Sequence, residues 1–496
     1  MHLLFIIKEI DNEPHGIMHI SALLKQEGHQ TSLVVATEED PVEAVLRLKP
    51  DVVGYTVYTG TQNYYLDLNR RIKKRLPGVF SIFGGPHPTF FPEMIEHEGV
   101  DGICVGEGEY ATLDLLNALQ AGAEIADIPN WHFKLARQGG GAFSLVTPST
   151  DRAKVEIIRN PVRPLLTSEQ LDELPFPDRD LLYNVHPASR RNKIRPFITG
   201  RGCPYSCTYC FNKAYRDLYQ GLGKAVRRRS VENVIREIKT VRQRYPLEFI
   251  TFMDDTFILH RPWLQEFAAR YKAEVGLPFW CQVRADLVTE EIMALFKEAG
   301  CVSVSFGLEA GNDRLRNAIL QRNMSREQIL EASRIFRQYG IAFMTNNMLG
   351  LPTGSLETDW ETLELNVQCR PSYANVFLFQ PYPKTTLGEW ACRAGWMTGS
   401  FDDLSGSVSD TTIIRFGSES ERRQIENLQK LFALAVEFPF LIPLIRVLIR
   451  LPRNGLFWLV YKIWKGYAIK RRMFPFRLTP REYVSTAWQY MRIRSQ

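Results

Sequence analysis

Three cysteines lie within eight residues of one another near the middle of the chain, at Cys203, Cys207 and Cys210. Thiolates this close in sequence can bind one metal centre, and soft sulfur suits an iron–sulfur cluster or zinc. A closed structural zinc site needs four ligands, and the next His or Cys after Cys210 is His260, fifty residues on. The spacing therefore favours a four-iron cluster with one iron open to a small molecule, and a zinc knuckle is the alternative.

The segment Arg201–Cys210 resembles the cluster loop of the radical S-adenosylmethionine (SAM) enzymes, C-x3-C-x-aromatic-C, with Tyr209 as the aromatic residue. The resemblance implies that SAM chelates the open iron. It also implies that an electron from the cluster cleaves SAM to methionine and a 5′-deoxyadenosyl radical, which takes hydrogen from a substrate.

The region around this loop alternates apolar strands with helices. Six strands are expected, at residues 195–200, 248–253, 279–284, 303–308, 342–349 and 375–379. Six strand–helix units predict a partial parallel (β/α)6 barrel, with functional residues at the carboxyl ends of the strands by analogy with the full barrel.

Charged residues follow the second and third of these strands. Asp254 and Asp255 would repel each other if both were buried; they could bond to ribose hydroxyls, orient a neighbour, or cap the helix expected at 261–272. Arg284 could reach the SAM carboxylate, or instead pair with Asp286 or Asp255.

Later strand ends extend the family resemblance. Ser305–Glu309 resembles the family's G-x-E segment, which implies that Glu309 bonds to the SAM ribose or amino group and that Gly307 permits close approach. Asn346–Pro352 is similar to the fifth strand end, where Gly350 would lie near the adenine. The predicted SAM-binding residues are Tyr209, Asp254, Arg284, Gly307, Glu309, Asn346 and Gly350, and no catalytic residue is assigned.

Residues 1–122 also alternate strands and helices. Strands are expected at 3–7, 31–36, 51–57, 79–83 and 102–105, and helices at 16–26, 41–49, 62–75, 92–97 and 110–121. This pattern predicts a doubly wound parallel sheet of the Rossmann or flavodoxin type, whose ligands bind outside the carboxyl ends of the strands.

The loops at that edge resemble the cobalamin-binding domain that precedes many radical SAM domains, through Gly84–Thr89 and Gly106–Glu109. The Asp-x-His-x-x-Gly motif, whose histidine ligates cobalt in other cobalamin proteins, is absent. His87 is therefore either a cobalt ligand or a loop histidine bonded to backbone. The predicted cobalamin-binding residues are Gly16, Thr59, Gly84, Gly85, Pro86, His87, Gly106 and Glu107.

The rest of the chain divides into a connector at 123–190, the barrel at 191–390 and a helical region at 391–496. The connector contains a hairpin expected at Trp131–Leu135 and Phe143–Val146. Segment 438–481 carries ten Lys or Arg, no acidic residue and many large apolar residues. It predicts either a helix lying in a membrane interface with its cations snorkelling to head groups, or a helical lid with a solvated basic face. Its cations include Arg446, Arg450, Lys462 and Lys465.

Composition narrows the compartment and the partners. Eight cysteines in 496 residues make no disulfide framework, and no uncharged apolar run reaches the ~18 residues of a membrane span. The net charge of +6 does not by itself indicate nucleic acid. We expect a cytoplasmic protein that segment 438–481 could hold against the inner membrane face.

The resemblance implies an enzyme with a 4Fe-4S cluster, SAM and cobalamin, which methylates an unactivated carbon via methylcobalamin. The expected substrate is a small molecule, lipid-like or a tetrapyrrole, and the expected electron donor is a flavodoxin or a ferredoxin. The alternatives are a radical oxidative cyclase or other radical rearrangement without methyl transfer, an RNA-modifying radical SAM enzyme, and a non-catalytic corrinoid or redox sensor.

Overall fold

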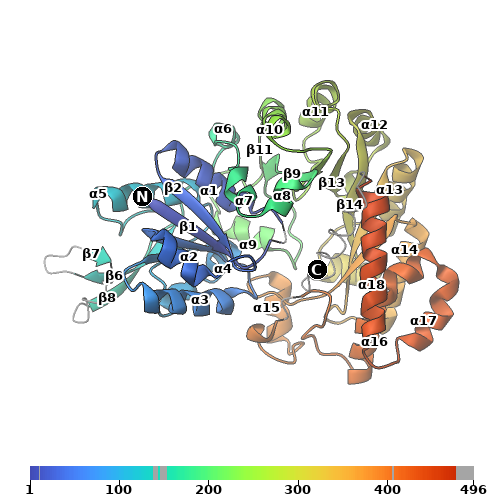
Figure 1. The fold of residues 1–496 in the computed structure, drawn as a ribbon. Coiled ribbons are helices and arrows are strands. Elements are labelled where there is room, and N and C mark those ends of the chain that lie inside the picture. The colour runs from blue at the N-terminus through green and yellow to red at the C-terminus, as the bar shows by residue number, and fades with distance from the viewer. Residues whose placement is uncertain (11, 138–142, 146–153, 405–406, 476–496) are drawn as a thin grey trace. The chain divides into compact units, whose positions relative to one another are not determined.

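The computed structural model describes residues 1–10, 12–137, 143–145, 154–404 and 407–475. The chain folds into two units (Figure 1). Unit 1 comprises Met1–Asn192 with Asp217–Lys224, and unit 2 comprises Lys193–Arg216 with Ala225–Gln496. Each is described by itself.

Unit 1 is built on a sheet whose first five strands are parallel and run in the order β2-β1-β3-β4-β5. This order confirms the predicted doubly wound sheet and is that of flavodoxin-like folds, which bind ligands where the order reverses between β1 and β3. The strands are β1 (His2–Ile7), β2 (Gln30–Val35), β3 (Val52–Thr56), β4 (Phe80–Gly84) and β5 (Gly102–Cys104).

Helices connect these strands close to the predicted positions. They are α1 (His15–Gln26), α2 (Pro41–Leu48), α3 (Gln62–Arg75), α4 (Pro86–Phe90) and α5 (Glu109–Ala121), with a 3-10 turn η1 (Pro92–Glu96) where a helix over 92–97 was predicted. Asp40 shows how the sequence sets one boundary, because its side chain accepts hydrogen bonds from the backbone N–H groups of Val42 and Glu43 at the start of α2.

The connector adds strands to the same sheet. The predicted hairpin is present as β6 (Trp131–Arg137) and β7 (Phe143–Leu145), and β6 pairs antiparallel with β5. A strand that was not predicted, β8 (Lys154–Arg159), pairs with β6. Val146, the expected end of the hairpin, lies outside the described residues. Three short helices follow, α6 (Ser168–Glu173), α7 (Arg179–Tyr183) and α8 (Pro187–Arg191).

Unit 2 contains six parallel strands in the order β9-β12-β13-β14-β15-β16, which confirms the predicted partial barrel. Within the described residues β9 and β16 do not pair with each other, so the barrel is open. The strands are β9 (Ile194–Phe197), β12 (Phe249–Phe252), β13 (Phe279–Val283), β14 (Cys301–Glu309), β15 (Ala342–Leu349) and β16 (Tyr373–Leu378).

The first strand is shorter than predicted. Gly200 and Arg201, placed at and beyond its end, instead form β10 (Gly200–Arg201), which pairs antiparallel with β11 (Arg227–Arg228). The helices between the strands are α9 (Phe211–Leu218), α10 (Val231–Arg244), α11 (Arg261–Glu274), α12 (Glu290–Ala299), α13 (Arg326–Gln338) and α14 (Leu356–Cys369).

Side chains of β16 alternate between the two faces of the sheet. Ala374, Val376 and Leu378 pack with residues of α14 and α16 on the outer face. Because side chains alternate along a strand, Asn375 and Phe377 face the barrel interior. The Asn375 amide donates to Asn346 Oδ1 of β15 at 3.1 Å, across that inner face.

The predicted helical C-terminal region is present as α15 (Thr386–Arg393), α16 (Glu419–Glu437), α17 (Ile442–Leu448), α18 (Gly455–Ala468) and the π-helix η7 (Ile469–Met473). α16 packs on β16, and α18 packs on both. Met473 joins Phe249 and Trp280 in one hydrophobic cluster, and its carbonyl accepts from the Ser303 hydroxyl at 2.5 Å. The end of this region therefore packs against the strands of the barrel.

The orientation of α18 corrects one prediction. Lys462 and Lys465 were expected on a solvated or snorkelling face, but their exposed fractions are only 1% and 8%. Leu456 and Ile463 are exposed instead, so α18 turns apolar side chains outward and lysines inward. None of the described helices has the length and hydropathy needed to cross a membrane.

Candidate active site

The cluster loop is held by tertiary contacts on both sides. Thr208, between the second and third cysteines, donates its N–H to Leu320 O at 3.1 Å and its hydroxyl to Ile319 O at 2.6 Å. Its carbonyl accepts from Leu387 N at 2.8 Å, and Arg216 donates to Cys203 O at 3.2 Å. These bonds fix the loop in a conformation that no regular secondary structure supplies.

The sulfur atoms of the loop accept hydrogen bonds. Cys210 Sγ accepts from the Asn212 backbone N at 3.4 Å and from its side-chain amide at 3.6 Å, and Cys207 Sγ accepts from Arg322 Nη1 at 3.6 Å. Donors to sulfur stabilise negative charge there and tune a bound cluster. Burial raises the pKa of Cys210 to about 11, so a bound cation is what would make this thiol a thiolate at neutral pH.

No three His, Cys, Asp or Glu side chains in the described ranges gather around one point as ligands of a single metal ion do. A four-iron cluster makes a different demand, because each thiolate binds its own iron at a separate corner. The donor set of three cysteines on one anchored loop suits the cluster better than it suits a zinc knuckle.

A buried chain of hydrogen bonds links the cluster loop to the fourth inner strand, β14. Arg322 donates to the Tyr209 hydroxyl at 3.3 Å and to Gly307 O at 2.6 Å, in addition to Cys207 Sγ. The Tyr209 hydroxyl donates to Glu309 Oε1 at 2.9 Å. Sequence inspection singled out Tyr209, Gly307 and Glu309 but missed Arg322, the residue that connects them.

Glu309 is held in a strained conformation. Its φ is +67°, in the left-handed region that a non-glycine residue adopts only when its surroundings impose it. A Cβ on Gly307 would lie 2.0 Å from Glu309 Oε1, so the glycine leaves room for this carboxylate. Burial raises the pKa of Glu309, while the Arg322 charge and the Tyr209 hydrogen bond oppose that rise.

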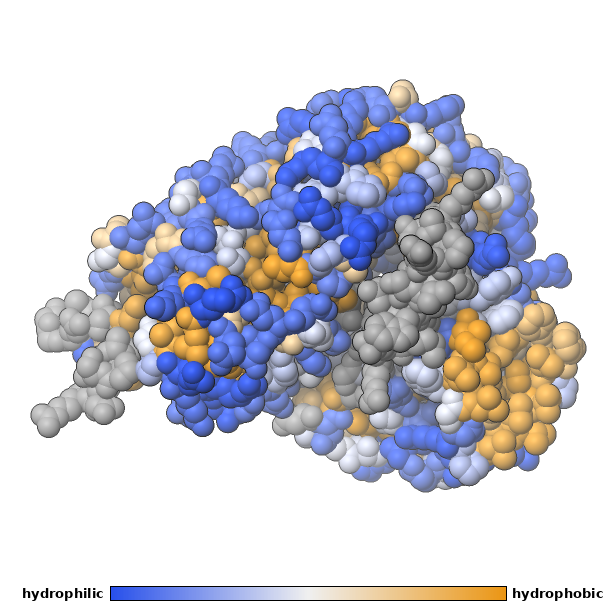
Figure 2. Space-filling view, viewed as in Figure 1, coloured by the Kyte–Doolittle hydropathy of each residue, from blue (hydrophilic) through white to orange (hydrophobic). Residues whose placement is uncertain are grey.

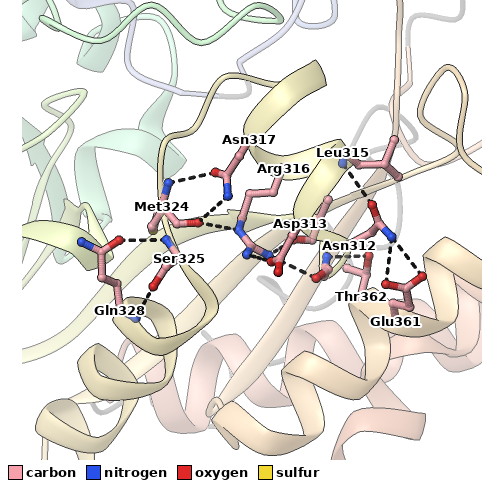
Figure 3. Close-up of polar contacts among 12 residues, drawn as sticks. Asn312, Asp313, Leu315, Arg316, Asn317, Met324, Ser325, Gln328, Glu361 and Thr362 are labelled. Atoms are coloured by element: carbon pink, nitrogen blue, oxygen red, sulfur yellow. Dashed lines mark hydrogen bonds and ion pairs between the residues drawn. The ribbon is translucent and has the colours of Figure 1, made fainter.

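Arg316 organises the loop that carries Arg322 (Figure 3). Its fully buried guanidinium donates to Met324 O at 2.8 Å and Ala310 O at 2.9 Å, and it pairs with Asp313. Asn317 closes the same loop by donating to Met324 O at 3.1 Å and accepting from Met324 N at 2.9 Å. Backbone carbonyls satisfied by one buried arginine thus position the next one.

The structure places the two aspartates after β12 differently. Asp254 is buried and accepts from Thr199 N at 3.1 Å and Thr199 Oγ1 at 2.7 Å. Asp255 is exposed, beside the Asn212 amide, which lowers a carboxyl pKa that burial of its surroundings raises. Neither caps α11. The cap is His260, whose Nδ1 accepts from Trp263 N at 3.2 Å, so the capping interpretation was wrong.

Arg284 makes the ion pair that was considered as an alternative to SAM binding. Its Nε donates to Asp286 Oδ1 at 2.8 Å, its Nη2 donates to Arg322 O at 2.7 Å, and its guanidinium carbon lies 3.6 Å from the Tyr205 ring centroid. Its Nη1 is buried without a hydrogen-bond partner. One donor of Arg284 therefore remains for an anionic ligand.

The last two predicted SAM residues separate. Asn346 lies on the inner face of β15, bonded to Asn375. Gly350 has a φ of +70°, and a Cβ there would lie 3.0 Å from the Phe416 ring. Packing of Phe416 accounts for this glycine without a ligand.

In unit 1, two predicted cobalamin residues meet at the carboxyl edge of the sheet. Thr59 Oγ1 and His87 Nδ1 lie 3.2 Å apart, and the backbone N of His87 donates to Val57 O at 2.9 Å. The His87 ring stacks on Phe91 with centroids 4.6 Å apart. Burial lowers the pKa of His87 to about 4, so the imidazole is neutral at neutral pH. These contacts fit a structural loop histidine.

The predicted glycines of this edge have distinct surroundings. A Cβ on Gly106 would overlap the Tyr219 hydroxyl, which accepts from Glu107 N at 3.0 Å, and Glu107 Oε2 accepts from Leu166 N at 3.0 Å. These two positions are therefore occupied by contacts within unit 1. Gly84 and Gly16 have no atom within 3.9 Å of a built Cβ, and Pro86 begins α4.

Two family models match the chain. The radical SAM superfamily model matches residues 197–365, and the B12 binding domain model matches residues 8–116. The chain belongs to the cobalamin-binding radical SAM enzymes. The matches fall on the partial barrel with the cluster loop and on the doubly wound sheet, so the recognition made from the sequence is confirmed.

Relatives and a solved structure agree with this assignment. An uncharacterized methyltransferase of Pyrococcus horikoshii is 27% identical over 386 residues, covering 76% of this chain and 78% of that protein. An anaerobic magnesium-protoporphyrin IX monomethyl ester cyclase of Rubrivivax gelatinosus is 27% identical over 391 residues, covering 75% and 65%. The structure of the cobalamin-dependent radical enzyme OxsB with aqua-cobalamin and SAM bound superimposes with a TM-score of 0.66 at 15% identity, covering 94% and 71%.

The cofactors of this radical SAM enzyme are a 4Fe-4S cluster, SAM and cobalamin. The residues present fit them. Polar atoms of the barrel domain are buried without partners, among them Arg284 Nη1, Ser305 Oγ and Asn375 Oδ1, as expected of groups that await a polar ligand. In unit 1, Tyr58 is a large aromatic side chain that stays 58% exposed directly after β3, at the edge where a flat ligand would bind.

The Gly85→Ala substitution should reduce cobalamin retention. Gly85 has a φ of +98°, and a Cβ would lie 3.0 Å from Thr56 Oγ1 and 3.1 Å from Val57 N, so alanine must displace the β3 and β4 loops at the ligand edge. We expect unit 1 to lose about 1–3 kcal/mol of stability and cobalt per chain to fall. Gly28→Ala is the control, because Gly28 has a φ of +84° with nothing near its Cβ position. Equal cobalt retention by both variants would contradict the role of this loop.

Proposed function

We propose that this enzyme transfers a methyl group to an unactivated carbon. The observation that carries the proposal is the presence of a B12 binding domain and a radical SAM domain on one chain, together with a relative named as a methyltransferase. When bound, the cluster and SAM supply a radical that removes hydrogen, and cobalamin supplies a methyl group.

The chain's own residues position these groups. Cys203, Cys207 and Cys210 would hold the cluster, and Glu309 would bond to SAM at the end of β14. Arg322 places a positive charge beside Cys207 Sγ and keeps the Tyr209–Glu309 pair in place. A fixed, buried arrangement of this kind provides orientation and excludes water, which is what a protein contributes to cofactor chemistry.

The products formed from SAM test the proposal without knowledge of the substrate. Reduced enzyme loaded with cobalamin should form S-adenosylhomocysteine, because a methyl group leaves SAM intact as a group, and should also form 5′-deoxyadenosine by reductive cleavage. Formation of 5′-deoxyadenosine alone would refute methyl transfer. That result would favour the second candidate, radical cyclisation without methyl transfer, which the similarity to the Rubrivivax gelatinosus cyclase supports.

We also propose that unit 2 contacts an anionic membrane surface and that the substrate is lipid-like. Eight large hydrophobic side chains of the C-terminal helices are exposed, and we call them the apolar face. They are Phe440, Leu444, Val447, Leu451, Leu456, Leu459, Ile463 and Tyr467. Figure 2 shows them as a broad hydrophobic area.

Charge at the apolar face argues for lipid as its occupant. Arg446 and Arg450 are exposed one helical turn apart on and just after α17, among the apolar side chains. Insertion of large apolar residues with arginines at their border is the arrangement of interfacial helices, which bind best to anionic lipids. An apolar patch of this extent on a soluble surface marks an interaction site.

Vesicle sedimentation measures this contact. The wild-type chain should bind vesicles that contain phosphatidylglycerol more strongly than vesicles of phosphatidylcholine alone, and Leu444→Glu with Val447→Glu should reduce binding at least ~10-fold, since each charge must leave the apolar layer. Val185→Glu, at an exposed valine of unit 1, is the control. Unchanged binding by the double variant, or a concentration-dependent dimer that the double variant abolishes, would contradict membrane docking.

A further inference from the structure

Three lysines gather where α16 and α18 pack beside β16. Lys430 lies on α16, and Lys462 and Lys465 lie on the inward side of α18. Lys465 Nζ is 3.2 Å from the Tyr461 hydroxyl and 5.9 Å from the Phe377 ring centroid. Because Phe377 faces the barrel interior, Lys465 lies at the open β16 edge of that interior.

The positive charge of this cluster is poorly compensated. Among the described residues no carboxylate lies within 4.0 Å of Lys430 or Lys465. Lys430 is bonded to two neutral acceptors, Ser409 O and, at 2.6 Å, Gln429 Oε1. Burial lowers the pKa of Lys430 to about 8, and burial followed by the charge of Lys465 lowers the pKa of Lys462.

Burying an ammonium group without a carboxylate costs several kcal/mol, so its presence needs a reason. Hydroxyl groups lie beside the ammonium groups, since Ser409 Oγ and the Tyr461 hydroxyl are 3.3 Å apart. Nearby acidic groups are already engaged, because Glu426 pairs with Arg453 and accepts from Thr411 Oγ1 at 2.7 Å. The site thus offers cations and hydroxyl donors next to an aromatic ring.

We propose that Lys465, with Lys462 and Lys430, binds an anionic oxygen group of the substrate, a phosphate or a carboxylate, at the β16 edge of the barrel. The proposal rests on the proposed function, because it assigns the polar end of that enzyme's substrate. The apolar part of the same molecule then lies toward Phe377 and the barrel interior. The lysines are binding residues and take no part in the radical chemistry.

The test compares thermal unfolding of the full-length chain with and without inorganic phosphate, against sodium chloride of equal ionic strength. Phosphate at about ten times its dissociation constant should raise the melting temperature of the wild-type chain by ~2–4 °C. Lys465→Met should show no phosphate-dependent rise. Without phosphate it should melt at a higher temperature than wild type, because an uncompensated buried charge has been removed.

Lys272→Met, at a solvent-exposed lysine paired with Glu298, is the matched control and should keep the phosphate-dependent rise. Lys465→Gln is the second variant should the methionine variant misfold. Acetate replaces phosphate in a parallel series, and a rise with either anion that depends on Lys465 supports the site and names its preferred group.

A phosphate or acetate effect that survives in both Lys465 variants, or no effect of either anion on the wild-type chain, overturns the proposal. A Lys465→Met variant of lowered stability that still responds to phosphate shows a structural lysine and also overturns it. Neither cobalamin nor SAM is needed for this measurement, so its failure is distinguishable from failure of methyl transfer, which is read from S-adenosylhomocysteine.

Discussion

Cys207→Ala should reduce reductive cleavage of SAM to the background level while cobalamin binding by unit 1 persists. Cys207 contributes one of the three thiolates on the cluster loop, and its sulfur is the one bonded to Arg322, at 3.6 Å. Loss of one of three thiolates leaves the cluster with too few ligands to stay bound. The measurement is 5′-deoxyadenosine formed by the anaerobically reconstituted, reduced variant, with iron and cobalt counted per chain.

The control is Cys392→Ser, because Cys392 is an exposed cysteine outside the loop. It should retain iron, cobalt and SAM cleavage at the wild-type level. Full SAM cleavage by a reconstituted Cys207→Ala variant would refute the assignment of the cluster to this loop.

Glu309→Gln should weaken SAM binding by about 10- to 100-fold, since a hydrogen bond to a charged group contributes ~1.5–3 kcal/mol. The φ of +67° and the close approach over Gly307 hold the Glu309 carboxylate at the end of β14. Glutamine keeps the shape but removes the charge and one acceptor. The measurement is the SAM dissociation constant of the reconstituted, unreduced chain.

Glu357→Gln, at an exposed carboxylate on α14, serves as the control and should bind SAM normally. If Glu309→Gln binds SAM as tightly as wild type, Glu309 is a structural partner of Tyr209 and Arg322 and the SAM contact is wrong. A loss of thermal stability without a loss of SAM affinity leads to the same conclusion.

Local patterns in the sequence were sufficient for the architecture. Buried parallel strands such as Leu3–Ile7 appear as apolar runs, and their alternation with helices fixed both sheets. The cluster loop could be recognised because its three cysteines are close in sequence. β8 was missed because the pairing that stabilises it, with β6, lies beyond a segment with no strand pattern of its own.

The remaining errors concern contacts between distant residues. Arg322 lies 115 residues from Cys207 in sequence, and nothing local marks it as a partner of a cysteine sulfur. His260 was passed over as a helix cap because aspartate is the more frequent capping residue. Lys462 and Lys465 were placed on the wrong side of α18, because a helix with apolar residues all round does not reveal which face is buried.

Anaerobic reconstitution with iron, sulfide and hydroxocobalamin, followed by desalting and metal analysis, tests the central claim most directly. The radical SAM barrel and the B12 binding domain together predict about four irons and one cobalt per chain, with absorption from both the cluster and the corrin. A chain that retains about four irons and no cobalt would contradict methyl transfer by cobalamin and leave unit 1 without its assigned cofactor.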